Sequence, residues 1–270
     1  MINSLSLAIE EWFGIKADPL DIKKLQDYLW KTYGGENSQI LKQVFLSGEA
    51  ADFLTVNETY FFREPAHFSL LWDFLSSFKK SKILVCSAAV AAGCEAYSIA
   101  MLIEAYNKTL ETPFLYHIDA FDINPKVIET ALQGKYNARA LREDGKCFHY
   151  LANSYLAKLE SGYQIAVSLK ENISFFVHNL MNPLYPKTYD IIFFRNAFIY
   201  FLPKYRERIL SNLSAVLNDD GILIVGVSET AGAQHPGLKS INRNDVFYFQ
   251  KNAEGRIQKN LDLQKPNYAL

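Results

Sequence analysis

The chain has 270 residues, and its 28 lysines and arginines nearly balance 29 aspartates and glutamates, for a net charge of −1. This balance excludes a nucleic-acid protein that binds through clustered positive charge. Hydrophobic residues make up 49% of the chain, which excludes a disordered polypeptide. No stretch approaches the ~20 apolar residues of a membrane span, and the three cysteines are too widely spaced for metal-ligand pairs or a disulfide framework. The composition predicts a soluble cytoplasmic protein without a bound metal.

The first fifty residues are expected to be helical. Asp18 before Pro19 is a typical helix N-cap, and apolar residues then recur at helical spacing until Gly34 ends the run. A second short helix is expected over 38–46. Residues 1–62 contain nine acidic residues, five lysines and no arginine, so this segment has a charge of −4 and the remainder +3.

From Lys82 onward, apolar strands alternate with helices. Strands are expected over residues 82–87, 116–121, 173–178, 191–194, 222–227 and 246–250. Helices are expected over 97–106, 125–132 and 204–217, and a turn over 219–221. The alternation predicts an α/β fold with a mostly parallel sheet and helices on both faces. Residues 145–172 interrupt it, and because 163–169 alternates like an exposed strand, we expect a small β-rich insertion there.

Two strand ends carry candidate binding residues, since open α/β sheets bind ligands at the carboxyl ends of their strands. The alanine-rich loop after the first strand contains Gly93 and lets backbone approach a ligand closely, but a tight strand–helix turn accounts for it equally well. The second strand ends at Asp122, where a carboxylate could hold ribose hydroxyls or could cap the helix that follows Asn124. Together the two ends favour a cofactor that carries a nucleoside, without identifying it.

Six blocks then occur in a characteristic order: NETYFFRE (57–64), SAAVAAGCEAYSIAM (87–101), AFDINPKVIETALQGKY (120–136), NL (179–180), YDIIFFRNAFIYF (189–201) and DDGILIVGVSET (219–230). In order and spacing they resemble the CheR-type chemotaxis receptor methyltransferases. The resemblance implies a Rossmann-like class I methyltransferase domain over 53–250 with the β-subdomain at 145–172. It also implies an N-terminal helical domain at 1–52 and leaves a C-terminal tail at 251–270.

The resemblance implies an enzyme that uses S-adenosyl-L-methionine and releases S-adenosyl-L-homocysteine. Its product would be a glutamate methyl ester on the cytoplasmic region of a chemoreceptor or on a related signalling protein. We expect a monomer that binds no nucleic acid and does not insert into a membrane. No general base is required, because a glutamate side chain with a pKa of ~4.3 is already ionised at neutral pH.

The resemblance also implies roles for individual residues. The cofactor-binding candidates are Asn57, Thr59, Arg63, Gly93, Glu95, Asp122, Asn179, Leu180, Arg195 and Asn196. Those of the NETYFFR block would line the methionine end, Asp122 the ribose, and Asn179 with Leu180 the adenine. Arg195 and Asn196 would lie beside the methyl-transfer cleft. Arg63 and Tyr200 are the catalytic candidates, which would orient the carboxylate that accepts the methyl group.

Several of these residues could instead have a purely structural role. Arg63 could form a salt bridge near Glu64, Asn196 could cap the next turn, and Cys94 could be a low-pKa thiol or merely a small residue. The family's GEEPYS motif reads GCEAYS here, which favours a non-catalytic cofactor-binding module as an alternative. The arginine-free, acidic N-terminus is unlike the basic helix that docks an acidic receptor, which favours a methyltransferase with another protein or a small molecule as its substrate.

Overall fold

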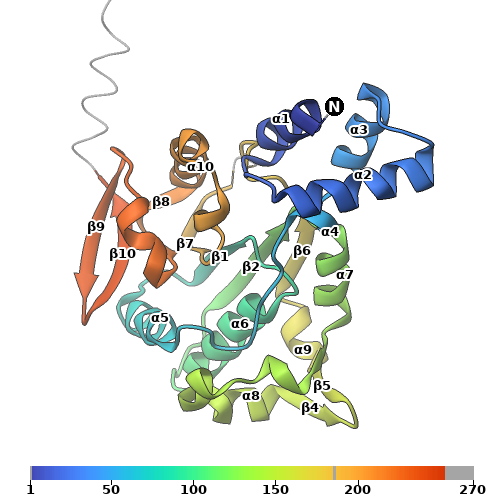
Figure 1. The fold of residues 1–270 in the computed structure, drawn as a ribbon. Helices are drawn as coiled ribbons and strands as arrows, with labels where there is room; N and C mark the ends of the chain where they lie inside the picture. The colour runs from blue at the N-terminus through green and yellow to red at the C-terminus, as the bar shows by residue number, and fades with distance from the viewer. Residues whose placement is uncertain (1, 185–186, 253–270) are drawn as a thin grey trace, which may run out of the picture.

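The computed structural model describes residues 2–184 and 187–252 of the chain. At its centre is a seven-stranded sheet with the order β6-β2-β1-β7-β8-β10-β9 (Figure 1). The five parallel strands are β6 (Ile173–Val177), β2 (Leu115–Asp122), β1 (Lys82–Ala88), β7 (Tyr189–Phe194) and β8 (Leu217–Val225). The antiparallel strands are β10 (Val246–Lys251) and β9 (Leu238–Arg243). The chain leaves β1 for β2 and β6 and later returns to pair β7 with the other side of β1, so β1 lies at the switch point where such sheets bind ligands.

Helices cover both faces of this sheet: α5 (Pro65–Ser77), α6 (Cys94–Asn107), α7 (Pro125–Gln133), α9 (Val167–Lys170) and α10 (Pro203–Ala215). Alternate residues of a strand face opposite sides, so each strand contributes to two cores. Val85 and Ile118 belong to the core that includes α5 and α6, whereas Cys86 and Phe121 belong to the core that includes α10. Burial on both faces explains the nearly continuous apolar runs of these strands and confirms the predicted α/β fold.

The N-terminal residues form the predicted helical domain, with α1 (Ile2–Phe13), α2 (Pro19–Tyr33), α3 (Ser38–Leu46) and α4 (Ala51–Leu54). Asp18 caps α2 by accepting a hydrogen bond from the Leu20 N–H at 2.8 Å, and Gly34 ends the helix with φ at 76°. The domain has a core of its own, which includes Leu25 and Val44. It lies over the carboxyl ends of the parallel strands (Figure 1), where the Leu202 N–H donates to the Gly14 carbonyl at 2.8 Å.

A small antiparallel sheet forms the β-subdomain, from β3 (Lys135–Asn137), β5 (Gly162–Ile165) and β4 (Leu156–Leu159). Strand β3 lies before residue 145, so the β-subdomain begins earlier in the chain than the insertion expected at 145–172. The strand expected over 163–169 ends at Ile165, and α9 follows from Val167, so that prediction is wrong for its second half. Between β3 and β4 lie 138–140 and 143–148, both 3-10 helices, and α8 (His149–Tyr155).

Three other expectations need correction. Residues 219–221 are not a simple turn, since they belong to an irregular part of β8, where the pairing with β7 passes from Leu217 directly to Ile222. Helix α10 accordingly ends at Ala215, and the sequence pattern missed α5 and β9. The tail expected at 251–270 begins inside β10, and residues 253–270 lie outside the described residues. No helix within 2–184 and 187–252 has the length and apolarity needed to cross a membrane.

Candidate active site

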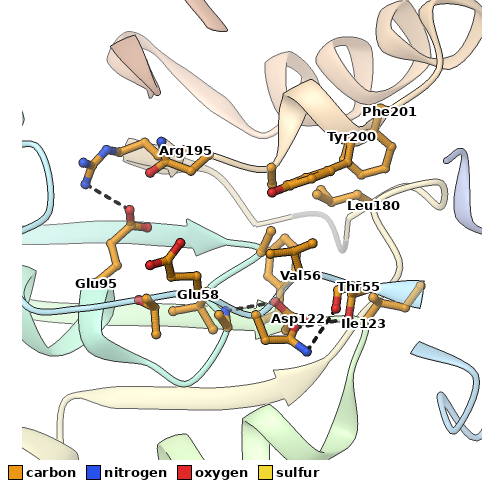
Figure 2. Close-up of a pocket in the computed structure, with 18 of the residues that line it drawn as sticks. Thr55, Val56, Glu58, Glu95, Asp122, Ile123, Leu180, Arg195, Tyr200 and Phe201 are labelled. Carbon is orange, nitrogen blue, oxygen red and sulfur yellow. Dashed lines mark hydrogen bonds and ion pairs between the residues drawn. The ribbon is translucent and has the colours of Figure 1, made fainter. Parts of the chain in front are cut away.

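A cleft opens at the carboxyl ends of β1, β2 and β7 (Figure 2). Its lining includes ten of the sequence-predicted residues: Asn57, Thr59, Arg63, Glu95, Asp122, Asn179, Leu180, Arg195, Asn196 and Tyr200. Gly93 is the exception, because it stands at the start of α6 with φ at 88° and lies outside the lining. A Cβ at Gly93 would come within 2.7 Å of the Ala131 Cβ, so this glycine lets α6 approach α7 closely.

The loop after β1 folds back onto the end of β2. Ala89 and Ala91 both have positive φ, 57° and 49°, a conformation that costs about 1–2 kcal/mol for a residue with a Cβ. Two hydrogen bonds hold the loop there: the Val90 N–H donates to the Phe121 carbonyl at 3.0 Å, and the Ala91 N–H donates to Asp122 Oδ2 at 2.9 Å. This loop is the tight strand–helix turn considered from the sequence, and its strained backbone also forms one side of the cleft.

Asp122 is nearly buried, with 7% of its surface exposed, and burial raises the pKa of its carboxyl. Besides Ala91, the Asn124 N–H donates to it, at 3.0 Å to Oδ1. Asn124 is itself the N-cap of α7, since it accepts from the Lys126 N–H at 2.9 Å, so the helix-cap role considered for Asp122 is wrong. A carboxylate has about four acceptor positions, and the backbone N–H groups of Ala91, Asn124 and Ile123 act on Asp122, so acceptor capacity remains for a hydroxyl group in the cleft.

A buried arginine organises the opposite side of the cleft. Arg195 is 5% exposed, and its Nη1 lies 3.1 Å from Glu95 Oε2 while its Nη2 lies 3.3 Å from Glu64 Oε2. Nη2 also donates to the Arg63 carbonyl, and Glu95 accepts from Ser87 Oγ at 2.7 Å. Burial raises the pKa of Glu95 despite the opposing charge of Arg195. Arg195 therefore neutralises two carboxylates and has little exposed surface for a ligand.

Glu64 links three segments of the chain that are far apart in the sequence. It accepts from Asn196 Nδ2 at 2.7 Å and from the Val227 N–H at 3.2 Å, and its Oε2 lies 3.1 Å from His67 Nδ1. Burial alone would raise the pKa of Glu64, but His67, Arg195 and the Asn196 amide together lower it far below its usual range. The Asn196 side chain is thus committed to Glu64 rather than to capping the next turn.

Glu229 was missed as a site residue by the sequence reasoning. It is 2% exposed and accepts three backbone hydrogen bonds, from Asn196 at 2.7 Å, Gly226 at 2.8 Å and Ile199 at 3.2 Å. Asn196 has φ at 58°, so this carboxylate stabilises an unfavourable backbone conformation beside the cleft. The only sequence signal was the acid in the last of the six blocks, GVSET.

Arg63 and Tyr200 present polar groups at the cleft. Arg63 Nη1 donates to the Glu58 carbonyl at 3.2 Å. Among residues 2–184 and 187–252, Arg63 has no carboxylate within ion-pair distance, and Glu64 pairs with Arg195 instead, so the salt bridge considered for Arg63 is not formed. Tyr200 is 43% exposed and directs its hydroxyl end into the cleft (Figure 2). These two side chains can therefore donate hydrogen bonds to a ligand.

The helical domain closes the cleft from the side opposite Glu95. Phe13, Ile15 and Leu54 join Leu180 and Phe201 in an apolar wall. Asn179, expected beside adenine, donates from its Nδ2 to the Trp12 carbonyl at 2.8 Å and accepts from the Met181 N–H at 2.9 Å. Its amide therefore binds the helical domain to the sheet.

Cys94, at the start of α6, is buried, and burial raises its pKa to about 12. A reactive thiolate requires a lowered pKa, so the small-residue interpretation holds. Phe61 and Phe62 of the NETYFFRE block are both fully buried and belong to the core.

Comparison with known proteins agrees with this geometry. The model of the family described as CheR methyltransferase, SAM binding domain, matches residues 57–259. The chain belongs to the CheR methyltransferase family. S-adenosyl-L-methionine is therefore its cofactor, as the sequence resemblance implied.

Individual relatives are similar at moderate identity. The chemotaxis protein methyltransferase of Borreliella burgdorferi is 33% identical over 193 residues, which cover 67% of each chain. That of Listeria monocytogenes is 29% identical over 230 residues, covering 81% of this chain and 82% of the relative. The probable biofilm formation methyltransferase WspC of Pseudomonas aeruginosa is 27% identical over 238 residues, 85% of this chain. The match covers 53% of WspC, so this chain spans about half of that relative.

Proposed function

We propose that the protein is an S-adenosyl-L-methionine-dependent O-methyltransferase that forms glutamate methyl esters on a chemoreceptor or a related signalling protein. One observation carries the proposal: Arg63 and Tyr200 are polar donors at the same cleft, and Arg63 has no carboxylate partner among the described residues. Two such donors suit an acceptor carboxylate, because this group is already ionised at neutral pH and only has to be oriented.

The lining fits the cofactor from end to end. In this proposal, the remaining acceptor capacity of Asp122 serves the ribose hydroxyls, and the apolar wall of Phe13, Ile15 and Leu180 packs against adenine. Asn57, Thr59 and Glu95 line the methionine end together with Arg63. Arg195 and Asn196 act indirectly: Arg195 holds Glu95 in place, and Asn196 holds Glu64.

The bound cofactor supplies a methyl group on a positively charged sulfur. Arg63 and Tyr200 would hold the two oxygens of the acceptor carboxylate, so that one oxygen is directed toward the methyl group that the cofactor would supply. Such positioning can lower a barrier by up to roughly 7–11 kcal/mol. The apolar wall limits water in the cleft, which strengthens the attraction between the carboxylate and Arg63.

The identity of the substrate rests on relatives and on charge. The relatives named as chemotaxis methyltransferases support a chemoreceptor. A signalling protein outside chemotaxis is the second candidate, favoured by the net charge of −4 over residues 1–62 and by the name of WspC. We propose a helical domain at 1–52 and a methyltransferase domain at 53–250, because the helical domain has a core of its own, whereas the tail expected at 251–270 stays a prediction. The monomeric state and the cytoplasmic location stay predictions.

Methyl transfer to membranes of the same cell tests this function. The protein is incubated with these membranes and cofactor labelled on its methyl group, and mild base then releases volatile methanol from any ester. We expect base-labile label on a membrane protein and the loss of this label with Arg63→Ala, whose thermal unfolding, unchanged from that of the wild type, verifies folding. Base-stable label would contradict the glutamate assignment, and full activity of the variant would contradict the role of Arg63.

A further inference from the structure

A pair of arginines shares one aromatic ring at the mouth of the cleft. The guanidinium carbon of Arg142 lies 4.2 Å from the centroid of the Tyr60 ring, and that of Arg63 lies 5.5 Å from the same centroid. The Tyr60 hydroxyl donates to Asp144 Oδ2 at 2.8 Å, which fixes the ring. Arg63 and Tyr60 line the cleft, whereas Arg142 comes from the segment that precedes α8. Arginine over an aromatic face keeps its N–H donors free for a carboxylate.

A carboxylate of this chain already pairs with Arg142, and the backbone of the same residue accepts a hydrogen bond from Arg63. Glu58 lines the cleft, and its Oε1 accepts from Arg142 Nη2 at 2.7 Å while its carbonyl accepts from Arg63. The Arg142 hydrogen bond and charge lower the pKa of Glu58, so the side chain is ionised at neutral pH. Figure 2 shows the Glu58 and Glu95 side chains reaching into the same side of the cleft. Chemically, Glu58 is the group that a glutamate acceptor would present.

The Glu58–Arg142 ion pair is exposed to solvent, so another carboxylate can easily replace Glu58 on Arg142. The side chains of Glu58 and Arg142 are 54% and 42% exposed, and exposed ion pairs contribute little to stability. Arg195, by contrast, is buried with its two carboxylates and is unsuited to exchange.

We propose that Arg142 and Arg63, held on the Tyr60 ring, form a carboxylate-binding subsite in which Glu58 pairs with Arg142 until a carboxylate of the methyl acceptor displaces it. The inference rests on the proposed function, because it takes the acceptor to be an acidic peptide segment with a glutamate. Arg142 then belongs to acceptor recognition, and Glu58 is an internal competitor that disfavours acceptors lacking negative charge.

Glutarate, which carries the carboxylate end of a glutamate side chain, is the probe for this subsite. Its affinity for the full chain is measured by NMR titration, following the side-chain N–H signals of arginine. We expect Glu58→Gln to bind glutarate about threefold to fivefold more tightly than the wild type, because the competitor is removed. The double variant Glu58→Gln/Arg142→Gln should lose this gain.

Glu143→Gln is the matched control. Glu143 is an exposed acid in the same segment, paired with Lys146 at 3.4 Å, so its substitution changes net charge equally without touching the subsite. Equal glutarate affinity in the wild type and Glu58→Gln would overturn the proposal, as would an equal gain in Glu143→Gln or a gain that survives in the double variant.

A tenfold weaker affinity of Glu58→Gln for S-adenosyl-L-homocysteine would also overturn it, by assigning Glu58 to the cofactor. Because no measurement here requires methyl transfer, the subsite can fail while the proposed function stands, and the reverse also holds.

Discussion

The buried carboxylate of Glu229 gives a sharp test of how the cleft is held. Its Oε2 accepts from the Asn196 and Gly226 N–H groups, and its Oε1 accepts from the Ile199 N–H. Glutamine has nearly the same shape but only one acceptor oxygen. In Glu229→Gln, that oxygen can serve Asn196 and Gly226, whereas the new amide nitrogen must face the Ile199 N–H, donor against donor.

The size of the effect follows from this arrangement. A buried N–H group left without an acceptor costs about 1–3 kcal/mol. The two remaining hydrogen bonds weaken when the charge is lost, but the variant no longer has to bury a charge, so these terms oppose each other. We expect a net loss of about 1–3 kcal/mol. For a chain of this size each kcal/mol lowers Tm by about 2–4 °C, so Tm should fall by about 2–12 °C.

Scanning calorimetry measures Tm, and titration calorimetry measures binding of S-adenosyl-L-homocysteine, which should weaken because the hydrogen bond that holds the Asn196 backbone beside the cleft becomes weaker when the charge is lost. Glu49→Gln is the control, since Glu49 accepts from the hydroxyls of Tyr28, Tyr33 and Ser47, which can rotate to suit an amide. Its Tm should fall less and its binding should stay unchanged. An unaltered Tm and affinity in Glu229→Gln would refute the reasoning.

Three further predictions concern the cofactor loop, the buried acid and the β-subdomain. Asp122→Asn should weaken S-adenosyl-L-homocysteine binding at least about tenfold in calorimetry, because an amide cannot accept from Ala91 and Asn124 and also from a ribose; unchanged binding would remove Asp122 from the site. Burial raises the pKa of the Glu95 carboxyl above 4.5, so lowering the pH through the raised value protonates Glu95 in the folded protein. This protonation favours folding. It also removes the negative charge that faces the cofactor. Affinity for S-adenosyl-L-methionine should therefore fall as the pH is lowered through that raised value, and a pH profile in Glu95→Gln as steep as the wild type's would contradict this. Gly162→Ala should cost about 2–5 kcal/mol, because its φ is 151° and the added Cβ would lie 1.9 Å from the Tyr136 carbonyl oxygen; hydrogen exchange should quicken in β3 and β5, and unchanged exchange there would be the contrary result.

Local sequence patterns predicted those features whose causes are local. Asp18 and Gly34 delimit α2 because a cap and a left-handed residue act on their own helix. The ends of β1 and β2 could be found from the sequence, because an apolar run followed by polar residues shows where a buried strand stops. These ends locate Asp122 and the loop that leads to Glu95. The cleft could therefore be located from the sequence alone.

Long-range contacts were beyond such patterns. Glu64 meets Asn196, and Glu58 meets Arg142, across more than 80 residues, and neither pair has a local signature. The expected turn at 219–221 failed for the same reason. Asp190 of β7 and Asp220 of β8 both pair with Lys80, at 2.7 and 3.2 Å, and no local pattern reveals these contacts.

A crystal structure of the protein with S-adenosyl-L-homocysteine would test the central claim most directly. The account predicts one molecule in the cleft, with its ribose hydroxyls on Asp122, its adenine against the wall that contains Phe13 and Ile15, and its sulfur facing the side of Arg63 and Tyr200. Density for the molecule elsewhere, or a ribose without contact to Asp122, would contradict it.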